Sequence, residues 1–145
     1  MSKSLFTLIG IIFLSVVSIQ AQESNIVGTW LNEEGTSHIR IFKATNGKYY
    51  GKIVWLKEDP ERLDVNNPDE SKRSIPLIDL IILRTFSYDS EDKQWNNGNI
   101  YDPKNGKTYS CYMWFEGSKD LLFIKGYILG MKFIGRETQW KRVKD

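Results

Sequence analysis

The chain is organised around residues 98–115, whose sequence is GNIYDPKNGKTYSCYMWF. Two strand-forming runs flank a turn in this stretch: Asp102-Pro103 favours the start of the turn, and Asn105-Gly106 tolerates the positive φ angles near its end. After the turn, the Tyr, Cys, Met and Phe at positions 109, 111, 113 and 115 share one face by the two-residue period of a strand. The other face mixes polar and aromatic residues. The stretch therefore predicts a β-hairpin with one face toward a core.

The rest of the chain repeats this pattern of short strands and turns. Turn residues recur every 8 to 14 residues, and the sequence contains no internal repeat and no helix pattern of ordinary length. We expect strands at residues 25–31, 37–43, 49–56, 81–88, 95–102, 107–116, 121–128 and 133–143, with a turn at 129–132. Such spacing is typical of an all-β antiparallel sandwich or barrel of about eight strands. We expect a single up-and-down barrel.

One long segment, residues 57–74, breaks the pattern because it is charged, contains two prolines and has no apolar period. Loops of this length in compact domains are either functional or poorly ordered. Its acids invite comparison with a calcium loop, but an EF-hand register places Asp69 where glycine is required and Ile75 where the bidentate Glu belongs. We therefore expect a solvated loop and no metal site. Residues 75–80 are expected to form either one short helical turn or a plug segment.

The first residues have the features of a secretory signal peptide. Lys3 precedes an apolar run from Leu5 to Val17, and Ala21 suits a peptidase site. The run is shorter than the roughly 20 residues that a membrane-spanning helix needs. We expect residues 1–21 to be cleaved and residues 22–145 to form one domain that is periplasmic or secreted, with no transmembrane segment after cleavage. No cysteine lies near the cleavage point, so a lipid anchor there is excluded.

Charge and composition exclude several functional classes. The formal net charge is +2, and Lys3 is the only charged residue among the first 21, so the mature chain is near neutral. Near neutrality gives no argument for a nucleic-acid partner or an anionic membrane surface. Cys111 is the only cysteine and is expected to be a buried small hydrophobe. His38 is the only histidine and is expected on the outer face, which excludes an inward Ser-His or Cys-His pair and a multi-histidine metal site. No cofactor is expected.

Two positions at the ends of the mature chain resemble the lipocalin-like (calycin) barrel. These are Gly28-x-Trp30 near the start and Arg142 near the end. In that superfamily a first-strand Trp packs at the closed floor of the barrel under an Arg from its end. The pairing is physically reasonable, because a guanidinium can stack on an indole while its N–H groups donate to carbonyls. The resemblance implies that Gly28, Trp30 and Arg142 form a structural floor.

A wider resemblance covers almost the whole mature chain. The segments that carry it are GTW (28–30), GKYYGKIVWL (47–56), DVNNP (64–68), GNIYDPKNGKTY (98–109), GY (126–127), and GR through WKR (135–142). In this order they resemble the exported bacterial family named domain of unknown function 2147. The resemblance implies a signal peptide, a small lipocalin-like barrel over residues 22–145 and no established activity. The chain departs from the pattern at Ile78-Asp79, where a glycine is expected in relatives.

The candidate ligand-binding residues are aromatic side chains expected to face inward and polar groups near the hairpin turn and the long loop. They are Tyr49, Trp55, Asp64, Tyr101, Asp102, Lys107, Tyr109 and Arg136. Trp55 is included because strand parity places it on one face with Tyr49, Gly51 and Ile53.

Structural roles for the same residues remain open. Asp102 suits an Asx-type turn and Lys107 suits solvent, because Asp-Pro-x-Asn-Gly is a turn sequence in its own right. Arg136 fits either a buried inward cation or a salt bridge. The tryptophans at positions 55, 95 and 114 fit either cavity lining or core and cross-strand packing.

Three functional hypotheses follow. Barrels of this size either fill with side chains or hold one small ligand, so the first is a non-enzymatic periplasmic or envelope protein that binds a small apolar or amphipathic ligand. The second is an interaction module that docks an envelope protein through the 57–74 loop and the outward aromatics Tyr50, Tyr112 and Trp114. The third is a hydrolase that acts through Asp64, Tyr101, Asp102 and Lys107, although the sequence contains no catalytic signature.

Overall fold

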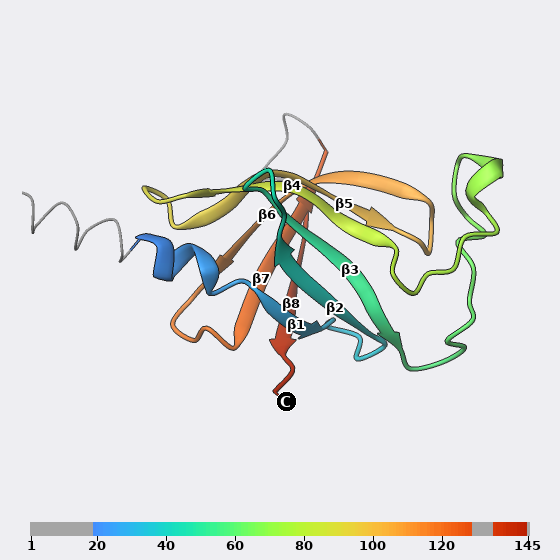
Figure 1. The fold of residues 1–145 in the computed structure, drawn as a ribbon, viewed down its shortest axis with the longest axis horizontal. Coiled ribbons are helices and arrows are strands. Elements are labelled where there is room, and N and C mark those ends of the chain that lie inside the picture. Colours follow the sequence, from blue (N-terminus) through green and yellow to red (C-terminus); the bar gives the residue numbers. More distant parts are fainter. Residues whose placement is uncertain (1–18, 129–134, 145) are drawn as a thin grey trace, which may run out of the picture.

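The computed structural model describes residues 19–128 and 135–144 of the 145-residue chain. Within these ranges the strands form one closed antiparallel barrel in which each strand pairs with its chain neighbours and the last pairs with the first (Figure 1). The strands are β1 (Gly28–Leu31), β2 (Ser37–Lys43), β3 (Tyr49–Leu56), β4 (Ile81–Asp89), β5 (Gln94–Asp102), β6 (Lys107–Phe115), β7 (Leu121–Tyr127) and β8 (Gly135–Arg142). The predicted all-β up-and-down barrel is confirmed. The predicted turn at 129–132 and most of the expected signal peptide lie outside the described residues.

The β5–β6 hairpin has its turn and its core face where they are predicted. Asp102 pairs with Lys107 across the turn, and Cys111 and Met113 on β6 are fully buried. Burial raises the pKa of the Cys111 thiol far above its usual range, which leaves it unreactive. The hairpin therefore contributes one face to the core, as its alternation predicts.

The first strand begins later than predicted, at Gly28 rather than Asn25. Residues 19–24 are helical, and the chain then turns beneath the barrel, where Ile26 is fully buried. The Trp30 indole nitrogen donates to the Ile26 carbonyl at 2.9 Å. In the described ranges no helix is long and apolar enough to span a bilayer.

Trp30 and Arg142 meet at this end of the barrel. The guanidinium carbon of Arg142 lies 4.2 Å from the centre of the Trp30 ring, and its N–H groups donate to the carbonyls of Asn25, Val27 and Lys119. A Cβ at Gly28 would lie 2.6 Å from Arg142 Nη1, so a side chain there would displace the guanidinium. We use the term floor for Trp30, Arg142 and the groups they contact.

The β3–β4 connection folds over the opposite end. It contains one 3-10 turn, Glu70–Lys72, with Asp69 as its N-cap. In the 75–80 segment, Pro76 forms an isolated β-bridge with Leu63, and Leu77 is buried inside the barrel, as a plug segment would be. Asp79 has a φ of +69°, a conformation that glycine adopts without steric cost, which accounts for the glycine expected in relatives.

Alternating strand directions bring the β1–β2, β3–β4 and β5–β6 connections together at the end opposite the floor. Figure 1 shows the long green β3–β4 loop beside the turn of the β5–β6 hairpin. The Asn66 side-chain amide donates to the carbonyls of Pro103 and Lys104 at 3.0 Å each. The loop is therefore fixed to the hairpin turn that the sequence singles out.

Candidate functional site

The barrel is filled near the floor and hollow at the other end. Near the floor, the Phe115 ring lies 5.9 Å from that of Trp30 and 5.5 Å from that of Trp95. Phe86 is fully buried, and a Cβ at Gly98 would lie only 2.4 Å from its ring. The remaining interior is a cavity of about 620 Å³. Small-molecule sites typically measure roughly 300–1,000 Å³, so the cavity has the size of a ligand site.

Apolar side chains from most strands form the cavity wall. Ile39 on β2 and Ile53 on β3 point inward by strand alternation. The wall also includes Leu56, Leu77, Ile82, Ile100, Tyr101, Tyr109, Ile124 and Trp140. Gly126 on β7 leaves space in this wall, because a Cβ there would make only ordinary contacts, 3.6 Å from the Cβ of Tyr109 and 3.7 Å from Ile100. The wall offers an apolar ligand a surface with few groups that need hydrogen bonds.

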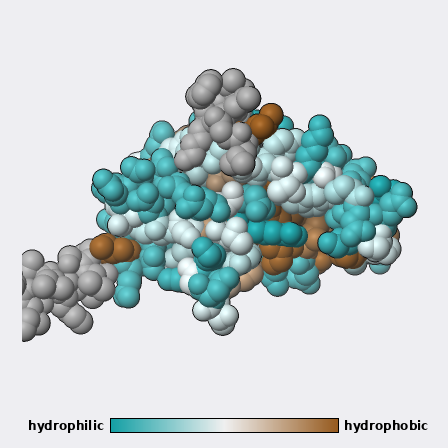
Figure 2. Space-filling model, turned by 90° about the horizontal axis from the view of Figure 1, so that it is seen from above, coloured by the Kyte–Doolittle hydropathy of each residue, from teal (hydrophilic) through white to brown (hydrophobic). Residues whose placement is uncertain are grey.

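Charged side chains surround the entrance of the cavity, and we refer to them as the rim. They are Glu33, Glu34, Lys57, Glu58, Arg62, Asp102, Lys104 and Arg136. Figure 2 shows apolar surface between hydrophilic side chains toward the end that carries the β3–β4 loop. An apolar interior with a charged rim suits a ligand with an apolar body and a polar end.

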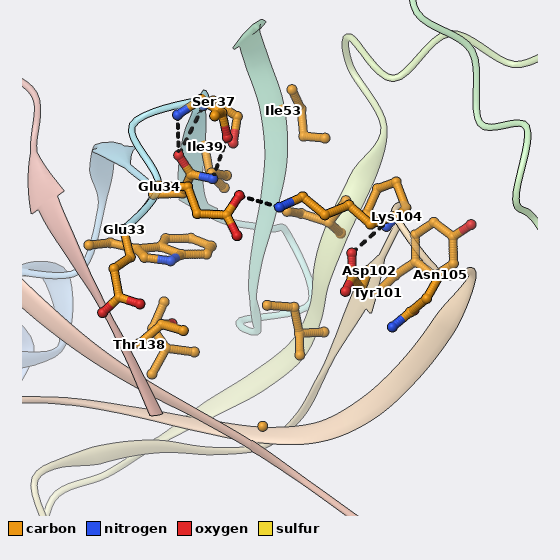
Figure 3. A pocket seen from close by; sticks show the side chains of 18 of the residues that line it. Glu33, Glu34, Ser37, Ile39, Ile53, Tyr101, Asp102, Lys104, Asn105 and Thr138 are labelled. Carbon is orange, nitrogen blue, oxygen red and sulfur yellow. Dashed lines mark hydrogen bonds and ion pairs between the residues drawn. The ribbon is translucent and has the colours of Figure 1, made fainter. Parts of the chain in front are cut away.

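The rim contains an ion pair that spans the entrance. Glu34 from the β1–β2 turn pairs with Lys104 from the β5–β6 turn, among the side chains that line the cavity (Figure 3). Arg136 at the start of β8 places its Nη2 3.9 Å from the other Glu34 oxygen. The hydrogen bond from Lys104 and, to a smaller extent, the charges of Lys104 and Arg136 hold the pKa of Glu34 below its usual value.

A buried carboxylate lies behind the cavity wall. Asp64 is 1% exposed, and it accepts hydrogen bonds from the Tyr101 hydroxyl at 2.7 Å and from the Asn67 amide at 2.8 Å. Burial and the bond to Asp64 raise the pKa of Tyr101 to about 12, so its hydroxyl remains a donor at neutral pH. The expectation of a solvated loop is wrong at Asp64, which ties the loop to β5.

The structure places four of the predicted site residues at the cavity. Tyr101 and Tyr109 contribute to the wall, and Asp102 and Arg136 lie at the rim. Asp64 is one hydrogen bond further out, behind Tyr101. Arg136 is not a buried cation, because its side chain is 75% exposed.

Three predicted site residues lie elsewhere. Tyr49 is buried in the filled half with its ring edge against Trp95, and Lys107 lines a separate depression with Tyr127 and Ile128. Trp55 is 40% exposed and packs against His38, with the ring centres 4.4 Å apart and the rings tilted by 35°.

The expectation that Trp55 shares a face with Tyr49 and Ile53 is wrong because β3 contains a bulge. His38 pairs with Trp55 and Ile39 with Ile53, so one extra residue, Val54, interrupts the register. The bulge inverts strand parity and directs Leu56, rather than Trp55, toward the cavity. Trp95 is core and Trp114 stacks on Tyr112 and Phe123, so neither lines the cavity.

The four groups of the hydrolase hypothesis are not assembled into one constellation. Asp64 and Tyr101 are in contact, but Asp102 accepts from the Lys104 backbone N–H at 2.9 Å as an Asx-type turn, and Lys107 lies outside the cavity. Among the described residues, no three His, Cys, Asp or Glu side chains gather in a way that would hold a metal ion. The arrangement offers recognition groups around an apolar space.

Sequence reasoning did not identify Glu34 and Lys104 as site residues. They are separated by 70 positions and each lies in a polar turn with no distinctive motif. The signal that would have found them is topological, since an up-and-down barrel brings alternate turns to the same end.

Fold and cavity together define the class of protein: a small lipocalin-like barrel, closed at one end by a Trp–Arg floor and hollow at the other. The profile of a family described as uncharacterized protein conserved in bacteria (DUF2147) matches residues 28–142. The chain therefore belongs to the DUF2147 family.

Among solved structures, the chain is similar to protein HP1028 of Helicobacter pylori, which is described as belonging to the lipocalin family. The TM-score is 0.72 with 20% sequence identity, over 83% of this chain and 84% of that one. At this identity the likeness shows the fold alone. No curated protein matches the chain.

Proposed function

We propose that this protein is a non-enzymatic binding protein that holds a small apolar or amphipathic ligand inside its barrel. The observation that carries the proposal is the cavity of about 620 Å³, with an isoleucine-rich wall and a charged rim, in a barrel whose other half is filled. Water in such a space contacts apolar surface, and a ligand that displaces this water gains hydrophobic free energy. The lipocalin-like fold supports the same proposal.

We further propose that the protein is exported to the periplasm or secreted. Lys3, the apolar run and Ala21 support a cleaved signal peptide. Cleavage after Ala21 is compatible with the floor, because it retains Glu23, which pairs with Lys43 at 2.8 Å, and the buried Ile26. Amino-terminal sequencing of the protein from its host tests this: Gln22 is the expected first residue, and an intact Met1 would contradict it.

Native mass spectrometry tests the binding proposal. The protein is purified gently from the envelope of its own host, and any bound molecule is extracted and identified. We expect a stoichiometric small molecule in the wild-type barrel. A Gly126→Leu variant should retain less of it, since its side chain enters the cavity without a clash at Cβ and occupies part of the space. Lys125→Leu, at the neighbouring position whose side chain does not line the cavity, is the matched control and should retain the ligand. A wild-type barrel that is empty and binds no apolar probe would contradict the proposal.

A second candidate function rests on the β3–β4 loop. This loop exposes three apolar side chains: Leu63 (38% exposed), Val65 (57%) and Ile75 (41%). Exposed apolar side chains favour docking to an envelope protein. The outward aromatics add less, because Trp114 stacks on Tyr112 and Phe123. Photo-crosslinking in cells from a probe at position 65, compared with one at position 125, tests this. A discrete partner only from position 65 would support docking, and equal crosslinking from both positions would argue against it.

A further inference from the structure

We infer that the ligand is an anionic amphiphile whose headgroup takes the place of the Glu34 carboxylate beside Lys104 and Arg136. The inference rests on the proposed binding function and specifies the chemistry of the ligand. It assigns the apolar wall to the ligand's body and the ion pair at the entrance to its charged end.

The position of the ion pair is the first argument. Glu34, Lys104 and Arg136 come from three different elements and meet at the entrance. Figure 3 shows the Glu34 and Lys104 side chains reaching toward each other across the pocket, among lining side chains that include Ile39 and Ile53. A headgroup bound at this point therefore has its apolar body directed into the isoleucine-lined space.

The balance of hydrogen-bonding groups at the rim is the second argument. Three of its acids are engaged: Glu34 by Lys104, Glu33 by the Gln139 backbone N–H at 3.2 Å, and Asp102 by the Lys104 backbone N–H.

Rim cations have fewer partners than the acids. Lys104 and Arg136 share the single acceptor Glu34, and within the described residues the side chains of Lys57 and Arg62 make no hydrogen bond or ion pair. Only one acid of the rim, Glu58, is similarly free. A ligand anion would thus find two rim cations, Lys57 and Arg62, without a partner among the described residues, whereas a ligand cation would find one such acid, Glu58, or would compete with Lys104 for Glu34.

The ease of exchange is the third argument. The side chains of Glu34, Lys104 and Arg136 are 41%, 56% and 75% exposed, and exposed ion pairs contribute little to stability. Replacing the Glu34 carboxylate by a ligand carboxylate or phosphate keeps both cations paired. An uncharged headgroup forms no ion pair at this point. The Glu34–Lys104 pair then stays across the entrance.

Displacement of a fluorescent apolar probe from the purified protein tests the inference. The competitors are dodecanoate, dodecyl phosphate, dodecanol and dodecyltrimethylammonium, at neutral pH, low ionic strength and concentrations below micelle formation. We expect at least one of the two anions to bind about tenfold or more tightly than dodecanol, as one charge-assisted contact would give. The comparison of dodecanoate with dodecyl phosphate shows which anionic headgroup is preferred.

Variants assign the preference to named residues. Lys104→Met combined with Arg136→Met should bring the affinities for anion and alcohol within about twofold of each other. Glu34→Gln should raise the affinity for the anion severalfold, because it removes the competing carboxylate. Lys141→Met is the matched control: it lies in the same strand as Arg136 but outside the cavity lining, and it should change nothing.

Each outcome separates this inference from the proposed function. Equal affinity for dodecanoate, dodecyl phosphate and dodecanol, or tightest binding of dodecyltrimethylammonium, would overturn the anionic headgroup and leave ligand binding intact. A preference that persists in the double variant would overturn the assignment to Lys104 and Arg136. No displacement by any competitor, and no binding of the probe, would overturn the binding function itself.

Discussion

A single side chain, Arg142, connects three separated parts of the chain at the floor. Its guanidinium covers the Trp30 ring and donates to carbonyls of Asn25, Val27 and Lys119. A planar fork of N–H donors is needed for this combination, and a lysine ammonium cannot reproduce it. At position 142 the planar shape of the guanidinium therefore matters more than its positive charge.

We predict that Arg142→Lys lowers the free energy of unfolding by about 2–3 kcal/mol, since hydrogen bonds to charged groups contribute roughly 1.5–3 kcal/mol. Urea unfolding followed by tryptophan fluorescence measures this. The control is Arg40→Lys on the outer face, whose Nη1 bonds only the Thr29 hydroxyl at 3.0 Å; it should change stability by less than about 1 kcal/mol. Equal midpoints for the two variants would contradict the role given to Arg142.

A second residue-scale prediction concerns the Tyr101 hydroxyl. Tyr101→Phe leaves the buried Asp64 with only its Asn67 partner, and we expect a loss of about 2–3 kcal/mol near neutral pH, the cost of depriving a buried charged group of a hydrogen bond. Tyr109→Phe is the control. Tyr109 also belongs to the wall, but its hydroxyl accepts only from Asn105, at an exposed site.

Tyr101 also makes stability depend on pH in the alkaline range. Its pKa rises from 10 in the unfolded chain to about 12 in the folded one. Its contribution is therefore complete below pH 10 and is lost as the pH rises through about 12. Consequently the difference in unfolding free energy between wild type and Tyr101→Phe should shrink from pH 9 toward pH 12. A difference that stays constant over this range would show that folding does not raise the pKa of Tyr101.

At the scale of elements, the β3–β4 loop and the β5–β6 turn form one unit. Asp64 bonds Tyr101 near the end of β5, and Asn66 bonds the carbonyls of Pro103 and Lys104. Gly106, with a φ of +71°, permits this approach, because a Cβ there would lie only 1.9 Å from the Asn66 carbonyl oxygen. The same turn carries Lys104, so the loop helps to position the rim.

We predict that Gly106→Ala detaches the loop, because the new methyl group overlaps the Asn66 backbone. Hydrogen exchange at residues 62–67 should accelerate about tenfold or more, and proteolysis within the loop should become faster. Gly47→Ala is the matched control: Gly47 has a φ of +80° with open space around its Cβ, so it suffers only the backbone strain of roughly 1 kcal/mol. If both variants leave exchange at 62–67 unchanged, the loop is not held by this contact.

These elements also show how far the sequence leads. Alternating residues and turn chemistry located the strands and the hairpin turn, because both are local properties of the chain. Local patterns could not reveal the bulge at Val54, which depends on pairing with β2, nor the burial of Asp64, whose partner Tyr101 is 37 positions away. The Glu34–Lys104 pair depends in the same way on barrel closure, so this part of the rim was missed although its hairpin was predicted.

At the scale of the whole molecule, stability and binding occupy different halves of the barrel. The aromatic residues near the floor form a packed core, whereas the isoleucines at the other end face a cavity. The filled half holds the barrel closed and can do so without any ligand. The hollow half is then free to accept a ligand with little effect on the fold.

This division predicts opposite outcomes for two similar truncations. Met113→Ala removes a fully buried side chain in the packed half and should cost about 2–5 kcal/mol, while the affinity for an apolar probe remains within about twofold. Ile53→Ala removes a side chain that already borders the cavity, so fewer contacts are lost and the cost should fall near or below the lower end of that range. Its affinity for the probe should change at least fivefold, because the wall itself is altered. Urea unfolding measures the stability of both variants, and probe titration measures their affinity. If the two truncations change stability by the same amount and affinity by the same factor, the barrel is not divided in this way.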